Sequence, residues 1–111
     1  MPQYMLLLYE NPAGWQKISP EEMQKAVEKY VAWTRKPFNK DSKRLGADLG
    51  RVIRSGPNGV RATDGPYSET KEVLGGFYLI EAANYDEAVK LAMTHPHAQY
   101  GTIEVRQVHG T

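Results

Sequence analysis

The sequence predicts one α+β domain, an antiparallel sheet with two helices on one face, and three observations on its 111 residues support this. Apolar runs with the length of strands open the chain, follow a Gly-Gly pair after its middle, and close it. Two segments between these runs combine helix start and stop signals with apolar residues at helical spacing. A Gly-rich middle section contains a turn signal that is typical of a β-hairpin.

The first strand is predicted at residues 4–10, YMLLLYE, a continuous apolar run typical of a central strand covered on both faces. The segment ISPEEM, residues 18–23, then predicts a helix start, with Ser19 as N-cap and Glu22 as its capping-box partner. We expect this helix to end or kink at Pro37, because proline removes a backbone donor and clashes with the preceding turn.

The middle of the chain predicts short strands and a hairpin. The basic run RKPFNKDSKR, residues 35–44, is interpreted as a solvated helix end or loop. Short strands are predicted near residues 47–49 and 51–54, between glycines. GPNG, residues 56–59, predicts a tight turn because Asn-Gly readily adopts positive φ, and GVRATDG, residues 59–65, is the expected second arm.

The last third predicts a strand, a helix and a strand. GGFYLIEA, residues 75–82, is an apolar and aromatic strand, and the next helix has Asn84 as N-cap and Pro96 as its stop. GTIEVRQV, residues 101–108, closes the chain as a strand. This order is the split β-α-β pattern of a ferredoxin-like domain with an extra central β-hairpin. Because two helices cannot cover both faces of the sheet, we expect a homodimer through the open face.

Composition excludes several classes of function. Fourteen Lys and Arg against thirteen Asp and Glu leave a formal charge of +1, which argues against direct nucleic-acid binding. The chain has no cysteine, and its longest apolar run is too short for a membrane span, so the cytoplasm is the expected location. Because no phosphate-binding glycine loop or nucleophile elbow is present, we expect no cofactor.

The segment TDGPYSETKEVLGGFY, residues 63–78, resembles the signature of the DGPF branch of the YCII-related family, with Tyr67 at the position of the family's Phe. The resemblance extends in order over nearly the whole chain. It implies a ferredoxin-like fold that dimerises through its sheet, as in the dimeric α+β barrel superfamily. It implies little about a reaction, because this family is largely uncharacterised.

Two functional ideas accompany the resemblance. Some relatives in the wider YCII group carry a His on the first helix and an Asp before a Pro after the second helix, which implies an active site. In this sequence Tyr30 stands at the His position and His95 at the Asp position, so neither residue keeps its usual form. DGPF-type domains also occur fused to, or associated with, sigma factors, which implies a module linked to transcription initiation.

The first half of this stretch, residues 64–71 (the DGPY segment), contains candidate ligand-binding residues. Asp64, Tyr67, Glu69 and Lys71 are expected around a pocket mouth, where Lys71 would hold an anionic ligand. The alternative is a rigid loop that re-enters the sheet, since Asp-Gly-Pro forms turns readily. For the loop as a whole both interpretations remain open, because its charge density exceeds what a turn needs.

Two histidines flank Pro96 just after the predicted second helix. A helix-terminal surface position is the simplest expectation, because cationic imidazole is favoured near a helix C-terminus. The alternative is acid–base chemistry by His95, paired with Tyr30 across a cavity between helix and sheet, with Asp64 as a further orienting group. A metal site is not expected, because His95 and His97 lack a predictable third ligand. The sequence thus leaves two functions: a ligand-binding or transcription-linked module, or a cofactor-independent small-molecule enzyme.

Overall fold

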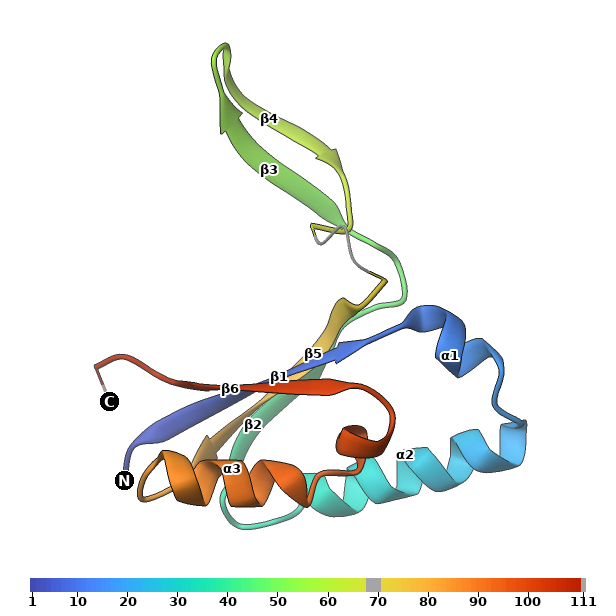
Figure 1. Cartoon of the computed structure of the whole chain (residues 1–111), viewed down its shortest axis with the longest axis vertical. Helices are drawn as coiled ribbons and strands as arrows, with labels where there is room; N and C mark the ends of the chain where they lie inside the picture. The colour runs from blue at the N-terminus through green and yellow to red at the C-terminus, as the bar shows by residue number, and fades with distance from the viewer. Residues whose placement is uncertain (68–70, 111) are drawn as a thin grey trace.

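The computed structural model describes residues 1–67 and 71–110 of the chain. Its helices and strands follow one another in the order β1 (Gln3–Glu10), α1 (Pro12–Gln16), α2 (Pro20–Thr34), β2 (Asn39–Arg44), β3 (Arg51–Gly56), β4 (Gly59–Asp64), β5 (Val73–Glu81), α3 (Tyr85–Met93), the 3₁₀ turn η1 (Pro96–Gln99) and β6 (Thr102–Gln107) (Figure 1).

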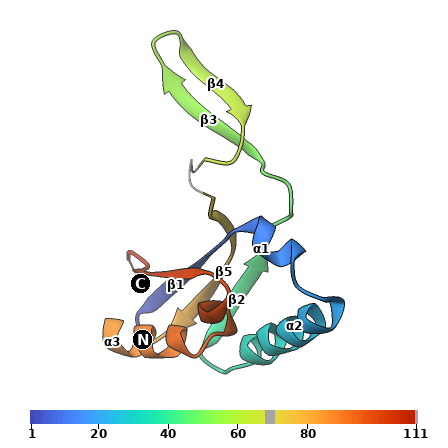
Figure 2. The same ribbon diagram turned by 45° about the vertical axis from the view of Figure 1, so that its right-hand side comes forward.

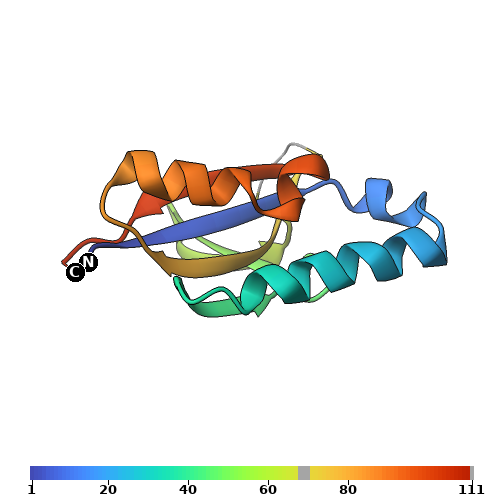
Figure 3. The ribbon, with the colours of Figure 1, turned by 90° about the horizontal axis from the view of Figure 1, so that it is seen from below.

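Four strands form one antiparallel sheet in the order β2-β5-β1-β6, and β3 and β4 form a separate two-stranded hairpin. Helix α2 lies between β1 and β2 in the chain, and α3 lies between β5 and β6. Seen from below in Figure 3, both helices lie in front of the sheet, on the same face. This is the split β-α-β arrangement with a hairpin inserted between β2 and β5, so the predicted ferredoxin-like α+β fold is confirmed.

Both long helices begin where the capping signals predict. Ser19 Oγ accepts a hydrogen bond from the Glu22 N–H at 3.1 Å, and Asn84 Oδ1 accepts one from the Glu87 N–H at 2.9 Å. Helix α2 ends at Thr34, before the expected proline stop. The caps matter for function because they fix the start of α2, and therefore which of its side chains face the sheet.

The core lies between the helices and one face of the sheet. Every second residue of β1 faces the helices and is buried, namely Tyr4, Leu6 and Leu8. The other members of the buried cluster are Trp33, Tyr78, Ile80, Ala82, Ala88 and Ala92. Met5 and Leu7 point to the opposite face and are half-buried. Strand β1 is therefore central, as predicted, but the described helices cover it on one face only.

The middle of the sheet differs from the sequence prediction in two places. Residues 39–44, predicted as part of a loop, form the strand β2, which pairs with β5. The sequence pattern does not predict this strand because NKDSKR is almost entirely polar. An edge strand tolerates such residues where a central strand does not. Residues 47–49, predicted as a strand, contain no strand in the structure.

The predicted hairpin is present and stands away from the rest of the molecule. Gly56 pairs with Gly59 at its tip, and Gly59 has a φ of 104°, which only glycine adopts without strain. Figures 1 and 2 show β3 and β4 projecting beyond the sheet in two views that differ by 45°. Apolar side chains on this hairpin are exposed, including Ile53 at 71% and Val60 at 73%.

Candidate functional site

A cavity of about 270 Å³ lies between α2 and one end of the sheet. Helix α2 contributes one face at helical spacing, Met23, Ala26, Val27, Tyr30 and Thr34. The sheet side is formed largely by Leu8, Glu10, Ser42, Arg44, Gly75, Gly76 and Tyr78, with Trp15 from α1 and His97 from η1. The cavity is mainly apolar with a few polar groups, which is typical of small-molecule sites.

Tyr30 and His97 form the closest polar pair on this cavity. The Tyr30 hydroxyl oxygen lies 2.6 Å from His97 Nδ1, and His97 Nε2 lies 2.7 Å from the Tyr9 carbonyl oxygen. Because a carbonyl can only accept, Nε2 carries the proton and donates it to Tyr9. Nδ1 is then the ring nitrogen that can accept, and the Tyr30 hydroxyl donates to it.

The environment keeps the Tyr30 phenol protonated. Burial is the main cause that raises the pKa of its hydroxyl above the ordinary value, and the Glu10 carboxylate raises it further. Arg44 acts in the opposite direction, which places its charge within electrostatic reach of the same hydroxyl. The pair is therefore a protonated phenol and an imidazole joined by a short hydrogen bond, along which a proton can move.

Gly101 makes the contact between His97 and Tyr9 possible. A Cβ at this position would collide with the Tyr9 carbonyl oxygen and would lie 2.7 Å from His97 Nε2. The backbone just before β6 can therefore pass close to the imidazole only where a side chain is absent. This requirement could not be predicted from the sequence, because Gly101 has the pattern of an ordinary strand boundary.

His95 lies behind the pair rather than on the cavity. It is 1% exposed and His97 is 2% exposed, so the expectation of surface positions is wrong for both. The Tyr30 and His95 rings do meet edge to face at 5.0 Å between centroids, but the Tyr30 hydroxyl bonds to His97. Pro96 explains the burial, because it starts the turn η1 that folds both rings back beneath α2.

His95 has a structural partner on one nitrogen. Its Nδ1 accepts from the His97 backbone N–H at 2.9 Å, which leaves the proton of the neutral ring on Nε2. Nε2 is buried without a hydrogen-bond partner among the described residues. Burial, and secondarily His97, lowers the pKa of His95 to about 4. The aromatic rings of Trp33 and Tyr78 surround it, each 4.6 Å away between centroids.

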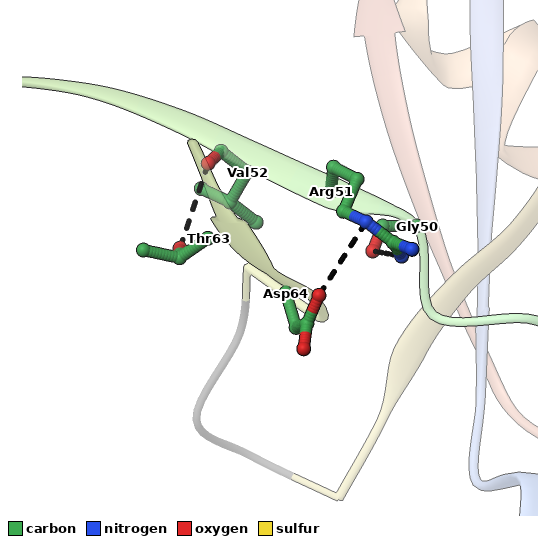
Figure 4. Close-up of polar contacts among 5 residues, drawn as sticks. All are labelled: Gly50, Arg51, Val52, Thr63 and Asp64. Carbon is green, nitrogen blue, oxygen red and sulfur yellow. Dashed lines mark hydrogen bonds and ion pairs between the residues drawn. The ribbon is translucent and has the colours of Figure 1, made fainter. Parts of the chain in front are cut away.

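The candidates of the DGPY segment lie elsewhere. Asp64, at the end of β4, has an exposed side chain whose Oδ1 lies 3.4 Å from Arg51 Nε, as Figure 4 shows at the hairpin base. Tyr67 is exposed, and the Arg54 guanidinium lies 5.3 Å from its ring centroid. Lys71 is exposed, and Glu69 falls outside the described residues. The described lining of the Tyr30 cavity includes none of them.

The Gly75-Gly76 pair, in contrast, belongs to this cavity. A bulge in the pairing of β1 with β5 skips Gly75, because Leu8 pairs with Gly76 and Tyr9 with Leu74. A Cβ on Gly75 would collide with the Glu10 carboxylate, and one on Gly76 would lie 2.7 Å from the Lys43 carbonyl oxygen. The two glycines therefore leave space that side chains would fill.

A second, open cleft of about 810 Å³ adjoins the first cavity. It lies between α1, the segment after β2 and the base of the hairpin, where Pro66 and Tyr67 line it. Four residues line both spaces: Glu10, Trp15, Arg44 and Gly75. Tyr67 thus borders the approach to the Tyr30 cavity rather than the cavity itself.

The described part of the chain contains neither a cluster of metal ligands nor a helix suited to a membrane. No three His, Asp or Glu side chains there come together as metal ligands would. No helix there combines the length and apolar character needed to cross a bilayer.

Comparison with known proteins agrees with this fold. The family model of the YCII-related domain matches residues 2–110. The uncharacterized protein R00369 of Rhizobium meliloti (strain 1021) is 33% identical over 116 residues, covering 93% of this chain and 89% of that protein. The structure of 5-chloro-2-hydroxyhydroquinone dehydrochlorinase (TftG) from Burkholderia phenoliruptrix AC1100, in complex with 2,5-dihydroxybenzoquinone, superimposes with a TM-score of 0.53 at 15% identity. That match covers 97% of this chain and 95% of the other, and it shows a shared fold.

Proposed function

Because the chain belongs to the YCII-related family and encloses a polar pair in a small cavity, we propose that it is a small-molecule enzyme working by acid–base chemistry. The observation that carries the proposal is the 2.6 Å contact between the Tyr30 hydroxyl and His97 Nδ1. A short bond between a phenol and a correctly oriented imidazole is what a proton-transfer step needs. The pair takes the place that the family resemblance gave to Tyr30 and His95.

The relay can be followed atom by atom. A hydroxyl or acidic C–H of the ligand gives its proton to the Tyr30 oxygen, while the Tyr30 proton passes to His97 Nδ1. The products are a ligand anion and an imidazolium, whose Nε2–H stays on the Tyr9 carbonyl. Return of the proton to another ligand atom completes an isomerisation, and loss of a leaving group completes an elimination. The raised pKa of Tyr30 favours this relay over a standing phenolate.

The structural comparison suggests a probe. The neighbour of similar fold is named a dehydrochlorinase and was solved with 2,5-dihydroxybenzoquinone, which favours a small oxygenated ligand here. We therefore expect the protein to accelerate exchange of the ring protons of 2,5-dihydroxybenzoquinone in D₂O, measured by NMR. His97→Gln and Tyr30→Phe should lower the rate about a hundredfold or more, since general acid–base catalysis supplies about 10²–10⁴.

The control for this experiment is Tyr67→Phe, which makes the same chemical change outside the cavity. It should exchange the probe at the wild-type rate. Equal rates in wild type, Tyr30→Phe and His97→Gln would contradict the proposal. Equal loss in Tyr67→Phe would instead move the reaction to the open cleft, which Tyr67 lines.

The hairpin favours a second candidate function, a protein-docking module linked to transcription initiation. It exposes Ile53 and Val60 beside Arg51, Arg54 and Arg61, a combination suited to a partner protein. A cytoplasmic sigma factor is the partner that the family resemblance suggests. A variant lacking residues 51–64 should fail to capture that factor from solution, and equal capture by both forms would exclude the hairpin as the docking element.

We also propose that the open face of the sheet pairs with a second copy of the chain. This open face consists of Met5, Leu7, Tyr9, Phe77 and Leu79, whose side chains alternate with the buried ones. All five are half-buried, and the helices lie on the other side of the sheet. A homodimer would remove this apolar surface from water, in keeping with the family resemblance.

A further inference from the structure

The cavity has two chemically different sides, and the strand order places them on opposite flanks of β5. Strands β1 and β2 flank β5 in the sheet. Glu10 ends β1 and Arg44 ends β2, and both line the cavity. His97 belongs to the β1 side, because it is anchored on the carbonyl of Tyr9, the residue next to Glu10. One side therefore carries an acid–base pair and a carboxylate, and the other carries a guanidinium.

The floor between the two sides is bare peptide. Gly75 and Gly76 both line the cavity, and the bulge in β5 places them next to each other there. Since a Cβ on Gly75 would collide with the Glu10 carboxylate, a side chain at this position would displace Glu10 from its place. Strands β1 and β2 lie on either side of β5 and are therefore about 10 Å from each other. A small ring can lie across the floor between them.

Both charges act on the catalytic phenol. Besides burial, which is the largest cause, the Glu10 carboxylate raises the pKa of the Tyr30 hydroxyl and Arg44 lowers it. Two opposite charges that reach the same hydroxyl from different strands create an electric field across the cavity. A ligand bound beneath Tyr30 is oriented by that field, because an anionic group is repelled from Glu10 and attracted to Arg44.

We propose that the ligand is a small planar anion that also carries a hydroxyl group, which deepens the proposed function and rests on it. Its anionic oxygens lie at Arg44, whose planar fork of donors matches such groups. Its hydroxyl points to the β1 side, where Glu10 accepts a hydrogen bond and the Tyr30–His97 pair takes the proton. The ring lies on the Gly75-Gly76 floor.

The size and walls of the cavity agree with this ligand class. A volume of about 270 Å³ lies just below the usual range for small-molecule pockets, which suits a single ring. Trp15 and Tyr30 meet edge to face at 6.4 Å between centroids, and both line the cavity as aromatic walls for a planar ligand. Glu10 and Arg44 also line the open cleft, so an incoming anion meets Arg44 at the entrance.

The test uses three probes in isothermal titration: 4-hydroxybenzoate, which has both groups, benzoate, which lacks the hydroxyl, and phenol, which lacks the anion. We expect 4-hydroxybenzoate to bind at least tenfold more tightly than either of the others. Arg44→Gln should weaken 4-hydroxybenzoate and benzoate tenfold or more and leave phenol unchanged. Glu10→Gln should bring benzoate to within threefold of 4-hydroxybenzoate, because the carboxylate that accepts a hydrogen bond from the ligand hydroxyl is gone.

The matched control is Arg54→Gln, the same change on the hairpin, which should leave all three affinities unchanged. Equal affinity of the wild type for the three probes, or equal effects of Arg44→Gln and Arg54→Gln, would overturn the inference, as would the absence of any binding. The outcome is separable from that of the proposed function, because it measures equilibrium binding. If exchange of the probe depends on His97 but not on Arg44, only the ligand class inferred here is contradicted. If binding depends on Arg44 but no exchange occurs, only the proposed reaction is contradicted.

Discussion

His95 stands where the family resemblance implies an Asp, and the structure shows which part of that role an imidazole keeps. A carboxylate at such a position can accept from the backbone N–H two residues on, and His95 Nδ1 does this for His97 at 2.9 Å. The aromatic rings around His95 explain why an imidazole replaces the carboxylate, because burying a neutral ring there needs less free energy than burying an anion. His95 thereby fixes the turn that aims His97 at Tyr30.

Burial of His95 predicts a loss of stability in mild acid. Its pKa is about 4 in the folded chain and about 6.5 in the unfolded chain, so only the unfolded state takes up a proton between these values. Stability from this group is complete above about pH 6.5 and falls as the pH drops to about 4, by at most about 3 kcal/mol. Urea unfolding at several pH values in this window measures the slope. His95→Asn, which can accept the same bond but does not titrate, should flatten it; an unchanged slope would assign the effect to another group.

Gly101 predicts a separate effect on His97. In Gly101→Ala the new methyl collides with the Tyr9 carbonyl oxygen and crowds His97 Nε2, so the anchor of the imidazole breaks. We expect a loss of about 1–3 kcal/mol in the free energy of unfolding and loss of probe exchange. The control is Gly14→Ala, whose Cβ would meet no atom within 4 Å. Thermal unfolding compares the two variants. Similar melting temperatures would show that the contact between His97 and the Tyr9 carbonyl can shift without loss of stability.

At the scale of elements, the sequence predicts what local chemistry decides. Ser19 and Asn84 mark the helix starts because their side chains cap the backbone directly, and the Gly56–Gly59 tip follows from Asn-Gly turn chemistry. Strand β2 could not be predicted, because its pairing with β5 depends on tertiary context that overrides its polar composition. The same limit hid His97, since only the fold of η1 decides which of two neighbouring rings meets Tyr30.

The two glycines of β5 predict different effects of alanine on the stability of the fold. In Gly75→Ala the methyl meets the end of the flexible Glu10 side chain, which can move aside, so the melting temperature should change little while benzoate and 4-hydroxybenzoate lose their difference in affinity. In Gly76→Ala it meets the Lys43 carbonyl oxygen of β2, which cannot move without disturbing the pairing. We expect a loss of about 1–3 kcal/mol there. Calorimetry measures the stability of both variants. A Gly75→Ala variant less stable than Gly76→Ala would contradict the contacts inferred for the two glycines.

At the scale of the whole molecule, a two-layer fold leaves one side of its sheet uncovered. Both long helices lie on the same side of the four-stranded sheet, as Figure 3 shows, so the described part of the chain forms one layer of helices on one sheet. Its open face has an apolar centre, and charged residues of the two edge strands frame it: Asp41 and Lys43 on β2, and Glu104 and Arg106 on β6. An apolar centre with a polar rim is the usual anatomy of a protein interface.

This face predicts how the protein sediments. Leu7 lies at its centre, paired with Phe77 across the two central strands, so Leu7→Asp would place an uncompensated charge in the middle of the contact. We expect the wild type to sediment as a dimer and Leu7→Asp as a folded monomer, with its circular dichroism preserved because the helix-facing core is untouched. Val89→Asp makes a similar change at an exposed position of α3 and should remain dimeric. A wild type that sediments as a monomer at all concentrations would remove the second copy from the proposal, and the cavity beneath α2 would then act within a single chain.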